Sequence, residues 1–280
     1  MLFSKLLDLF SHDVLRVGLS AYADLLAAYR PLFHIAVALW ALGISFEALT
    51  SESSFRPTVI KFVRGAVVIA YLTEPAVPRA FSQLLQAPAQ TSGVVVDHIV
   101  DGAGGKADAR GSNVRGNFGA SMDRLVERVG LKCKGMLLKA AWGDDPLTLT
   151  VAKILVVFVL LLAFLSVVLY VAALATFYQA ALLFLLPFAV TLYPWSYTRP
   201  LFDGVIRQGL SFSLVIPLLH ALLALVISPL DRALDPIHGT LVMLIPFGCL
   251  CVVGSLLALQ IPAVASGVAG GVGLPMLRLR

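Results

Sequence analysis

The chain has 280 residues, of which 59% are hydrophobic and only 13% are charged, and its mean hydropathy is +0.91. Soluble domains carry about 25% charged residues, so this composition excludes an ordinary water-soluble protein. The formal net charge is +5, and scattered Lys and Arg residues flank the apolar runs. Cations in that position more often set the orientation of a membrane protein than bind nucleic acid, so the basic balance gives no reason to infer a nucleic-acid partner.

Residues 1–28 are predicted to form an amphipathic helix. Phe3, Leu6, Phe10 and Val14 recur at helical spacing, and charged residues lie on another face. We expect this helix either to lie in the membrane interface or to pack on its neighbours. The segment does not have the compact cationic start, apolar run and small-residue cleavage site of a removable signal peptide.

Residues 29–81 are predicted to hold the first pair of transmembrane helices, over about 31–49 and 58–81. A helix needs about 20 predominantly apolar residues to cross the hydrocarbon of a bilayer. The second helix of the pair is the weaker one, because Lys61 and Arg64 lie near its start. Cations at a helix end can extend to the lipid headgroups, so we still expect this helix to cross.

Residues 82–149 form the central segment, which is rich in Gly, Asp, Arg, Ser and Asn. This composition predicts an extramembrane loop. Residues 122–138 have a rough helical stripe, although Gly130 and Gly135 weaken the prediction of a helix there. The sequence from Gly102 to Lys106 resembles a phosphate-binding loop only superficially, because Ala107 stands where Ser or Thr would hold magnesium.

Residues 150–262 are predicted to form a C-terminal transmembrane bundle, with spans over 154–177, 205–227 and 241–261. The intervening piece, residues 180–194, is short and contains Pro187 and Pro194. We expect it to dip into the membrane and return without crossing. Residues 263–280 form a tail of Gly and other small residues.

Short-loop cations predict five crossings. Basic residues gather at the turn after the first span, at the turn after Trp195 and at the carboxyl end, and such turns prefer the cytoplasm. The predicted fold is therefore all-α, a polytopic membrane bundle of five transmembrane helices with an amphipathic N-terminal helix and a re-entrant segment. The central loop is then periplasmic. A rival topology of six crossings, which keeps this loop inside, stays open.

The residue patterns predict no enzyme, cofactor or metal site. The five histidines have no ligand spacing, and the three cysteines include no CxxC pair and predict no disulfide. Two groups of residues are instead candidates for contacts with other subunits, although orientation anchors and a frayed tail are the alternatives. They are Trp195, Arg199 and Arg207 after the proline-rich turn, and Gly267, Gly270 and Gly271 in the tail.

The order of several motifs resembles a known family. An apolar run ends in Leu185-Leu186-Pro187-Phe188, and it is followed by Tyr193-Pro194-Trp195, by Thr198-Arg199-Pro200-Leu201-Phe202-Asp203-Gly204 and by the small-residue tail. This order is similar to that in the polytopic inner-membrane subunit of type IV secretion systems, the TrbL and sixth VirB protein family. The resemblance is firm over residues 151–273 and looser over 29–81.

The resemblance implies a structural and conduit subunit of the bacterial inner-membrane complex, which supports translocation and pilus assembly. Implied partners are the other inner-membrane subunits, the secretion ATPases and the major and minor pilins. A homo-oligomeric ring, five-fold in such systems, and transient contact with secreted DNA or protein are also implied. The alternative function is a small-solute transporter or permease subunit, for which inverted repeats and paired intramembrane charges would be expected. The resemblance leaves the type of cargo open.

Overall fold

The computed structural model describes residues 13–50, 55–73, 118–141, 146–195, 197–234 and 244–271, with the single positions 3, 5, 6, 80, 83 and 87. These residues form helices and no strand, which confirms the predicted all-α class. The helices are α2 (Val14–Thr50), α3 (Phe55–Thr73), α5 (Phe118–Ala141), α6 (Leu147–Leu192), α7 (Arg199–Leu234) and α8 (Ile245–Gly271). Most of the predicted central loop, the first turn and the end of the tail lie outside the described residues.

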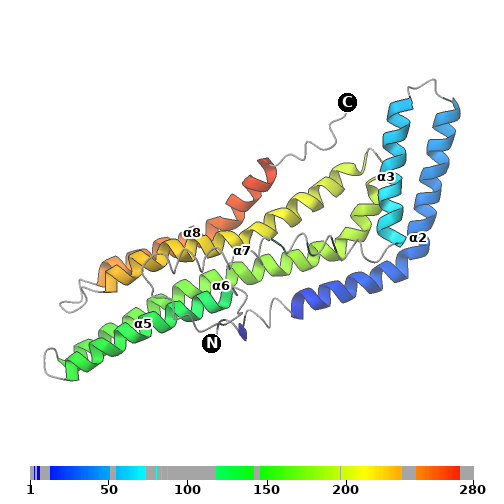
Figure 1. Cartoon of the computed structure of the whole chain (residues 1–280). Coiled ribbons are helices and arrows are strands. Elements are labelled where there is room, and N and C mark those ends of the chain that lie inside the picture. Colours follow the sequence, from blue (N-terminus) through cyan, green and yellow to red (C-terminus); the bar gives the residue numbers. More distant parts are fainter. Residues whose placement is uncertain are drawn as a thin grey trace, which may run out of the picture.

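The helices form one elongated bundle with the α2–α3 hairpin at one end (Figure 1). Helices α6, α7 and α8 each contact the other two, and α5 packs against α6 and α7. Helix α2 contacts α6 along its first part, then bends and pairs with α3. Pro31 lies inside α2, and a proline in a helix interior is the usual cause of a sharp bend.

The main hydrophobic core lies between α5, α6, α7 and α8. Phe164 and Leu165 of α6, Leu219 of α7 and Phe247 of α8 are completely buried there. Gly254 allows α8 to approach α6 closely, because a Cβ atom at this position would lie 2.8 Å from Cε2 of Phe164. Small residues at such a crossing let helix backbones come near each other. The resulting van der Waals packing is one of the forces that hold helices together in lipid.

A second core lies where α2 and α3 meet the end of α6 and the start of α7. It contains Phe33, Tyr71, Leu186 and Tyr193 among its buried residues. The rings of Phe33 and Phe188 meet edge to face with centroids 5.9 Å apart, which is a favourable aromatic geometry. This core fixes the α2–α3 hairpin against the α6–α7 turn.

Four helices are long and apolar enough to cross a membrane in the described part of the chain, namely those over Ala27–Phe46, Leu147–Leu192, Arg199–Val226 and Ile245–Gly270. They correspond to four of the five spans predicted from the sequence, those over about 31–49, 154–177, 205–227 and 241–261. The predicted second span is a helix, α3, but is not among the four. Its 19 residues include Arg56, Lys61 and Arg64, and three cations in so short a helix lower its hydropathy.

Residues 180–192 do not form the expected re-entrant dip. They continue α6 without interruption, and the helix passes through Pro187 to end at Leu192. A break at Pro187 would expose further backbone polar groups in an apolar setting, whereas continuing the helix satisfies them within the segment. The reversal of the chain occurs after Tyr193 instead, and α6 reaches 46 residues.

The outer surface of the helical bundle is apolar. Leu39 on α2, Phe177 on α6, Leu225 on α7 and Leu256 on α8 are each more than half exposed. Four long helices with such a surface need a hydrocarbon solvent, because a water-soluble monomer rarely exposes so much contiguous apolar area. The structure therefore agrees with a multi-pass membrane protein.

Candidate functional site

The turn between α6 and α7 and the start of α7 contain three of the six contact residues predicted from the sequence, Trp195, Arg199 and Arg207. Tyr193 closes α6, and its backbone N–H donates to the Val190 carbonyl oxygen at 3.1 Å. The Tyr193 ring is buried against Phe202 of α7, with ring centroids 4.6 Å apart. This contact ties the end of one span to the start of the next, so the turn has a fixed shape.

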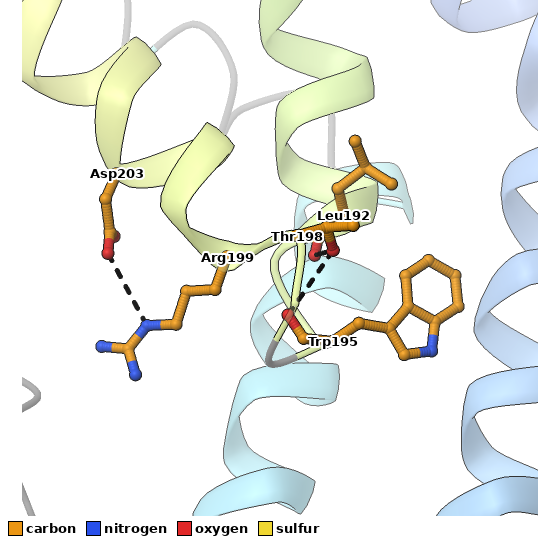
Figure 2. A network of polar contacts seen from close by, with 5 residues as sticks. All are labelled: Leu192, Trp195, Thr198, Arg199 and Asp203. Atoms are coloured by element: carbon orange, nitrogen blue, oxygen red, sulfur yellow. Dashed lines mark hydrogen bonds and ion pairs between the residues drawn. The ribbon is translucent and has the colours of Figure 1, made fainter.

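Thr198 holds the turn together through its hydroxyl group (Figure 2). Its Oγ1 donates to the Leu192 carbonyl oxygen at 2.6 Å and lies 3.5 Å from the Trp195 carbonyl oxygen. The backbone N–H of Arg199 also donates to the Trp195 carbonyl oxygen, at 3.0 Å. The last carbonyl groups of a helix have no partner within it, so Thr198 satisfies one of those left at the end of α6.

Arg199 forms an ion pair with Asp203, one turn further along α7. The Arg199 Nε and the Asp203 Oδ2 lie 3.8 Å apart, and the two side chains are 24% and 45% exposed. The Arg199 Nε is itself buried and makes no hydrogen bond among the described residues. A cation is unfavourable at a helix N-terminus, so the Asp203 carboxylate offsets part of that cost. A pair this exposed contributes about 0–1 kcal/mol.

Arg207 follows Asp203 after one more turn and is exposed. Residues four apart lie on the same side of a helix, so Arg199, Asp203 and Arg207 form a stripe of alternating charge on α7. We call these three residues the α7 charge stripe. Asp203 was not singled out from the sequence, although its spacing from both arginines was a signal that could have found it.

Trp195 lies on the other side of the turn from Arg199, and its indole points away from Arg199 and Asp203 (Figure 2). The side chain is half-buried. Tyr197, by contrast, is 96% exposed and is the most prominent aromatic group of the turn. The sequence analysis selected Trp195 as a contact residue but did not identify Thr198 as the group that holds the turn. A Thr just before a helix start is a capping signal for α7, but it does not indicate a hydrogen bond to the Leu192 carbonyl oxygen.

The glycines of the predicted tail belong to α8. Gly267 and Gly270 are exposed, and a Cβ atom at either would meet no atom within 4 Å. The Gly271 backbone ends the helix, and its surroundings lie outside the described side chains. The end of α8 lies apart from the α6–α7 turn in Figure 1, so the structure does not bring the two predicted groups together.

The described residues offer little reactive chemistry. No group of three or more His, Cys, Asp or Glu side chains among them could hold a metal ion. The His220 ring on α7 is buried and meets Phe118 edge to face, with centroids 4.7 Å apart. This contact fixes the start of α5 against a span and fits helix packing rather than ligand binding.

The comparison with known families identifies the chain. Residues 33–261 match the family described as TrbL/VirB6 plasmid conjugal transfer protein. No curated protein matches the sequence. The match covers well over half of the chain, and it includes most of the first span, the α6–α7 turn and α8 up to Ile261. The chain therefore belongs to the TrbL/VirB6 family, whose members are membrane components of conjugal transfer and type IV secretion.

Proposed function

We propose that the chain is a structural and conduit component of the inner-membrane complex of a type IV secretion or conjugation system, where it supports substrate translocation and pilus assembly. The observation that carries this proposal is the family match over residues 33–261 of a chain with four apolar spans. Its partners are other inner-membrane subunits, the secretion ATPases, which supply the energy, and the major and minor pilins. The chain has a scaffolding role and no catalytic one.

An in-frame deletion in a donor cell tests this function. We expect loss of substrate transfer and of pili, and recovery of both when the gene is supplied from a second plasmid. The partner subunits should remain in the membrane fraction, so that the loss reflects assembly or passage and not general damage. Unchanged transfer would contradict the proposal. Uptake of a metabolite by liposomes that contain the purified chain alone would favour the transporter alternative.

The α7 charge stripe is the surface we assign to contact between copies of the chain. Its order of charges, Arg199, Asp203, Arg207, lets Asp203 of one copy face Arg207 of the next. Electrostatic pairing of this kind fixes register between partners more than it adds affinity. Trp195, whose indole lies on the other side of the turn, and Tyr197 are proposed as a separate contact with a neighbouring copy. A closed ring of five copies is the assembly proposed from the family.

The exposed small face of α8, formed by Gly267 and Gly270, is a second proposed contact with a neighbouring copy. Small residues permit close approach of helices in lipid. The space beside each glycine is open, because a Cβ atom at either position would meet no atom within 4 Å. Gly267→Leu should therefore reduce the oligomer in mild detergent while the monomer stays folded. Val268→Leu, next to it on α8, is the matched control and should leave the oligomer intact.

The location and sidedness complete the proposal. We place the chain in the bacterial inner membrane, with the central loop of residues 82–149 in the periplasm. This topology needs α3 to cross as a fifth span, with Lys61 and Arg64 near the headgroups. In a Cys133→Ser background, Ser112→Cys should then react with an impermeant thiol reagent in intact spheroplasts. Labelling only after lysis would reject it.

A further inference from the structure

The outer face of α5 is unusual for a helix outside the apolar spans. Its buried stripe, Met122, Leu125, Val129, Cys133 and Met136, packs into the main core. The opposite stripe carries Glu127, Leu131, Lys134 and Leu138, all of them exposed. Leu131 is 64% exposed and Leu138 is 53% exposed. A water-facing helix would normally have polar residues at these positions.

The start of α6, which pairs with α5, also has an exposed apolar side. Leu147, Val151, Leu155 and Val159 recur along one side of α6, and Leu147 and Leu155 are 54% and 62% exposed. We call α5 together with residues 147–159 the α5–α6 arm. The chain doubles back on itself in this arm, so that α5 lies along the beginning of α6 (Figure 1).

The length of α6 limits how much of this helix can cross the hydrocarbon. A helix of 46 residues is about 69 Å long at 1.5 Å per residue, whereas the hydrocarbon of a bilayer is about 30 Å thick. More than half of α6 must therefore be strongly tilted or lie outside the hydrocarbon. The exposed apolar side chains of that part need a cover other than the acyl chains that surround the spans.

The charges of α5 indicate that this helix, and the start of α6 beside it, lie outside the hydrocarbon. Glu127 and Lys134 are exposed on α5, and Arg128 and Lys132 are half-buried beside them. Several charges within eight residues are costly in the hydrocarbon, so α5 does not lie there. Exposed leucines interleaved with a lysine are equally out of place in water. Leucines on one face with cations at their flanks suit the headgroup layer, where apolar groups sink and cations meet lipid phosphates.

We propose that the outer face of the α5–α6 arm lies in the headgroup layer of the membrane, with Leu131, Leu138 and Leu155 inserted below the phosphates and Lys134 on the phosphate of an anionic phospholipid. The exposed apolar side of the arm is continuous with the lipid-facing side of α6. Helix α5 carries five Lys and Arg residues against Asp123 and Glu127, and this net positive charge is complementary to anionic lipid. This anchoring does not depend on the proposed secretion function.

Depth-dependent quenching in lipid discs tests the arm. In a full-length chain carrying Cys133→Ala, Cys249→Ala and Cys251→Ala, an environment-sensitive fluorophore is attached at Leu138→Cys. The discs contain phosphatidylcholine alone or an equimolar mixture with phosphatidylglycerol, and the quencher is a nitroxide either on the headgroup or near the end of the acyl chain. Leu257→Cys, in the middle of α8, is the matched control for a site deep in the hydrocarbon.

We expect a blue-shifted emission at position 138 and stronger quenching by the headgroup nitroxide than by the chain-end nitroxide, with the reverse order at position 257. Phosphatidylglycerol should increase the quenching at position 138. Lys134→Glu should abolish that increase, and Lys134→Arg should keep it. A second label at Leu131→Cys gives the same readout if the first variant does not fold.

Three outcomes would overturn the proposal. Quenching at position 138 by neither nitroxide would show that water or a protein partner covers the arm. The depth order of position 257 would place the arm in the hydrocarbon. Quenching that ignores both phosphatidylglycerol and Lys134→Glu would remove the anionic lipid from the site. Substrate transfer by the donor cell is measured separately, so failure here leaves the proposed secretion function intact.

Discussion

The indole of Trp40 on α2 packs directly on the backbone of Gly65 on α3, with no room between them for a side chain. A Cβ atom built on Gly65 would overlap the Trp40 ring, and Trp40 itself is only 7% exposed. This contact sets how closely the two arms of the α2–α3 hairpin approach. It also explains why a large aromatic residue can be buried in a hairpin of only two helices.

Gly65→Ala should therefore destabilise the protein, although alanine is the better helix former. Overpacking of a tight contact costs about 1–3 kcal/mol, so we expect a lower thermal midpoint in mild detergent. Gly43→Ala on α2, where a Cβ atom would meet no atom within 4 Å, is the control and should not lower it. Adding Trp40→Leu to Gly65→Ala should recover part of the loss; no recovery would refute the contact.

Thr198→Val should loosen the turn between α6 and α7. The change removes the hydroxyl that donates to the Leu192 carbonyl oxygen, at a cost of about 1 kcal/mol for an ordinary hydrogen bond. We expect faster cleavage at the turn by a protease added to detergent-solubilised protein. Thr198→Ser keeps the hydroxyl and should behave like the parent.

Thr191→Val is the second control for the turn. The Thr191 Oγ1 donates to the Phe188 carbonyl oxygen within α6, and that oxygen already belongs to the helix ladder. Equal protease sensitivity of Thr191→Val and Thr198→Val would therefore argue against a special role of Thr198.

Gly254→Ala should weaken the packing of α8 on α6. The Phe164 ring lies close enough that even a Cβ atom at Gly254 would be 2.8 Å from it, and Phe164 is completely buried. A loss of about 1–3 kcal/mol is expected from overpacking, measured as a lower thermal midpoint. At Gly248 a Cβ atom would only touch Leu160 at 3.5 Å. If Gly248→Ala lowered the midpoint as much as Gly254→Ala, the crossing would not be where the structure puts it.

The spans of α6, α7 and α8 could be predicted from the sequence because a run of about 20 apolar residues has few other solutions. Their bounds could not be predicted. Pro187 was expected to break the chain, yet α6 continues through it, because a helix buried in apolar surroundings gains more from keeping its backbone bonds than proline takes away. Sequence rules that treat proline as a helix breaker do not take account of the apolar surroundings of the helix.

The candidate contact residues show the same division. Arg199 and Arg207 could be chosen from the sequence because they flank an apolar span. The pairing of Arg199 with Asp203 was also within reach of helix spacing. The contact of Trp40 with Gly65 was not, because it depends on how α2 and α3 cross, and no local pattern encodes that angle. The same holds for Thr198, whose acceptor lies six residues earlier.

Reversal of charge tests the α7 charge stripe as a contact between copies. Arg207→Asp would place like charges together if Asp203 of one copy faces Arg207 of the next, so we expect less oligomer at low salt. Combining it with Asp203→Arg restores opposite charges and should restore the oligomer. Each exposed pair contributes about 0.2–1 kcal/mol, and a ring repeats this contribution at every interface between copies. Arg16→Asp, at an exposed position near the start of α2, controls for the change in net charge, and an equal loss there would discount the stripe.

The thiol of Cys133 reports whether α5 stays packed on the core. It is 4% exposed, and burial raises its pKa above the ordinary value of 9.0, because an apolar setting disfavours the thiolate. The folded state then holds the thiol proton more tightly than the unfolded state. This contribution to stability is complete below about pH 9 and is lost as the pH rises towards the folded pKa.

In a chain carrying Cys249→Ala and Cys251→Ala, Cys133 should react slowly with a charged maleimide at pH 8 and faster as the pH is raised. The same chain unfolded in dodecyl sulfate should react quickly at pH 8, because the thiolate is the reactive form. Leu131→Cys, with Cys133→Ala, is the control on the outer face of α5 and should react faster than Cys133 in discs without anionic lipid. Equal rates for the folded and unfolded Cys133 would mean that α5 leaves α6 and α7, and the buried stripe of α5 would then not be part of the core in solution.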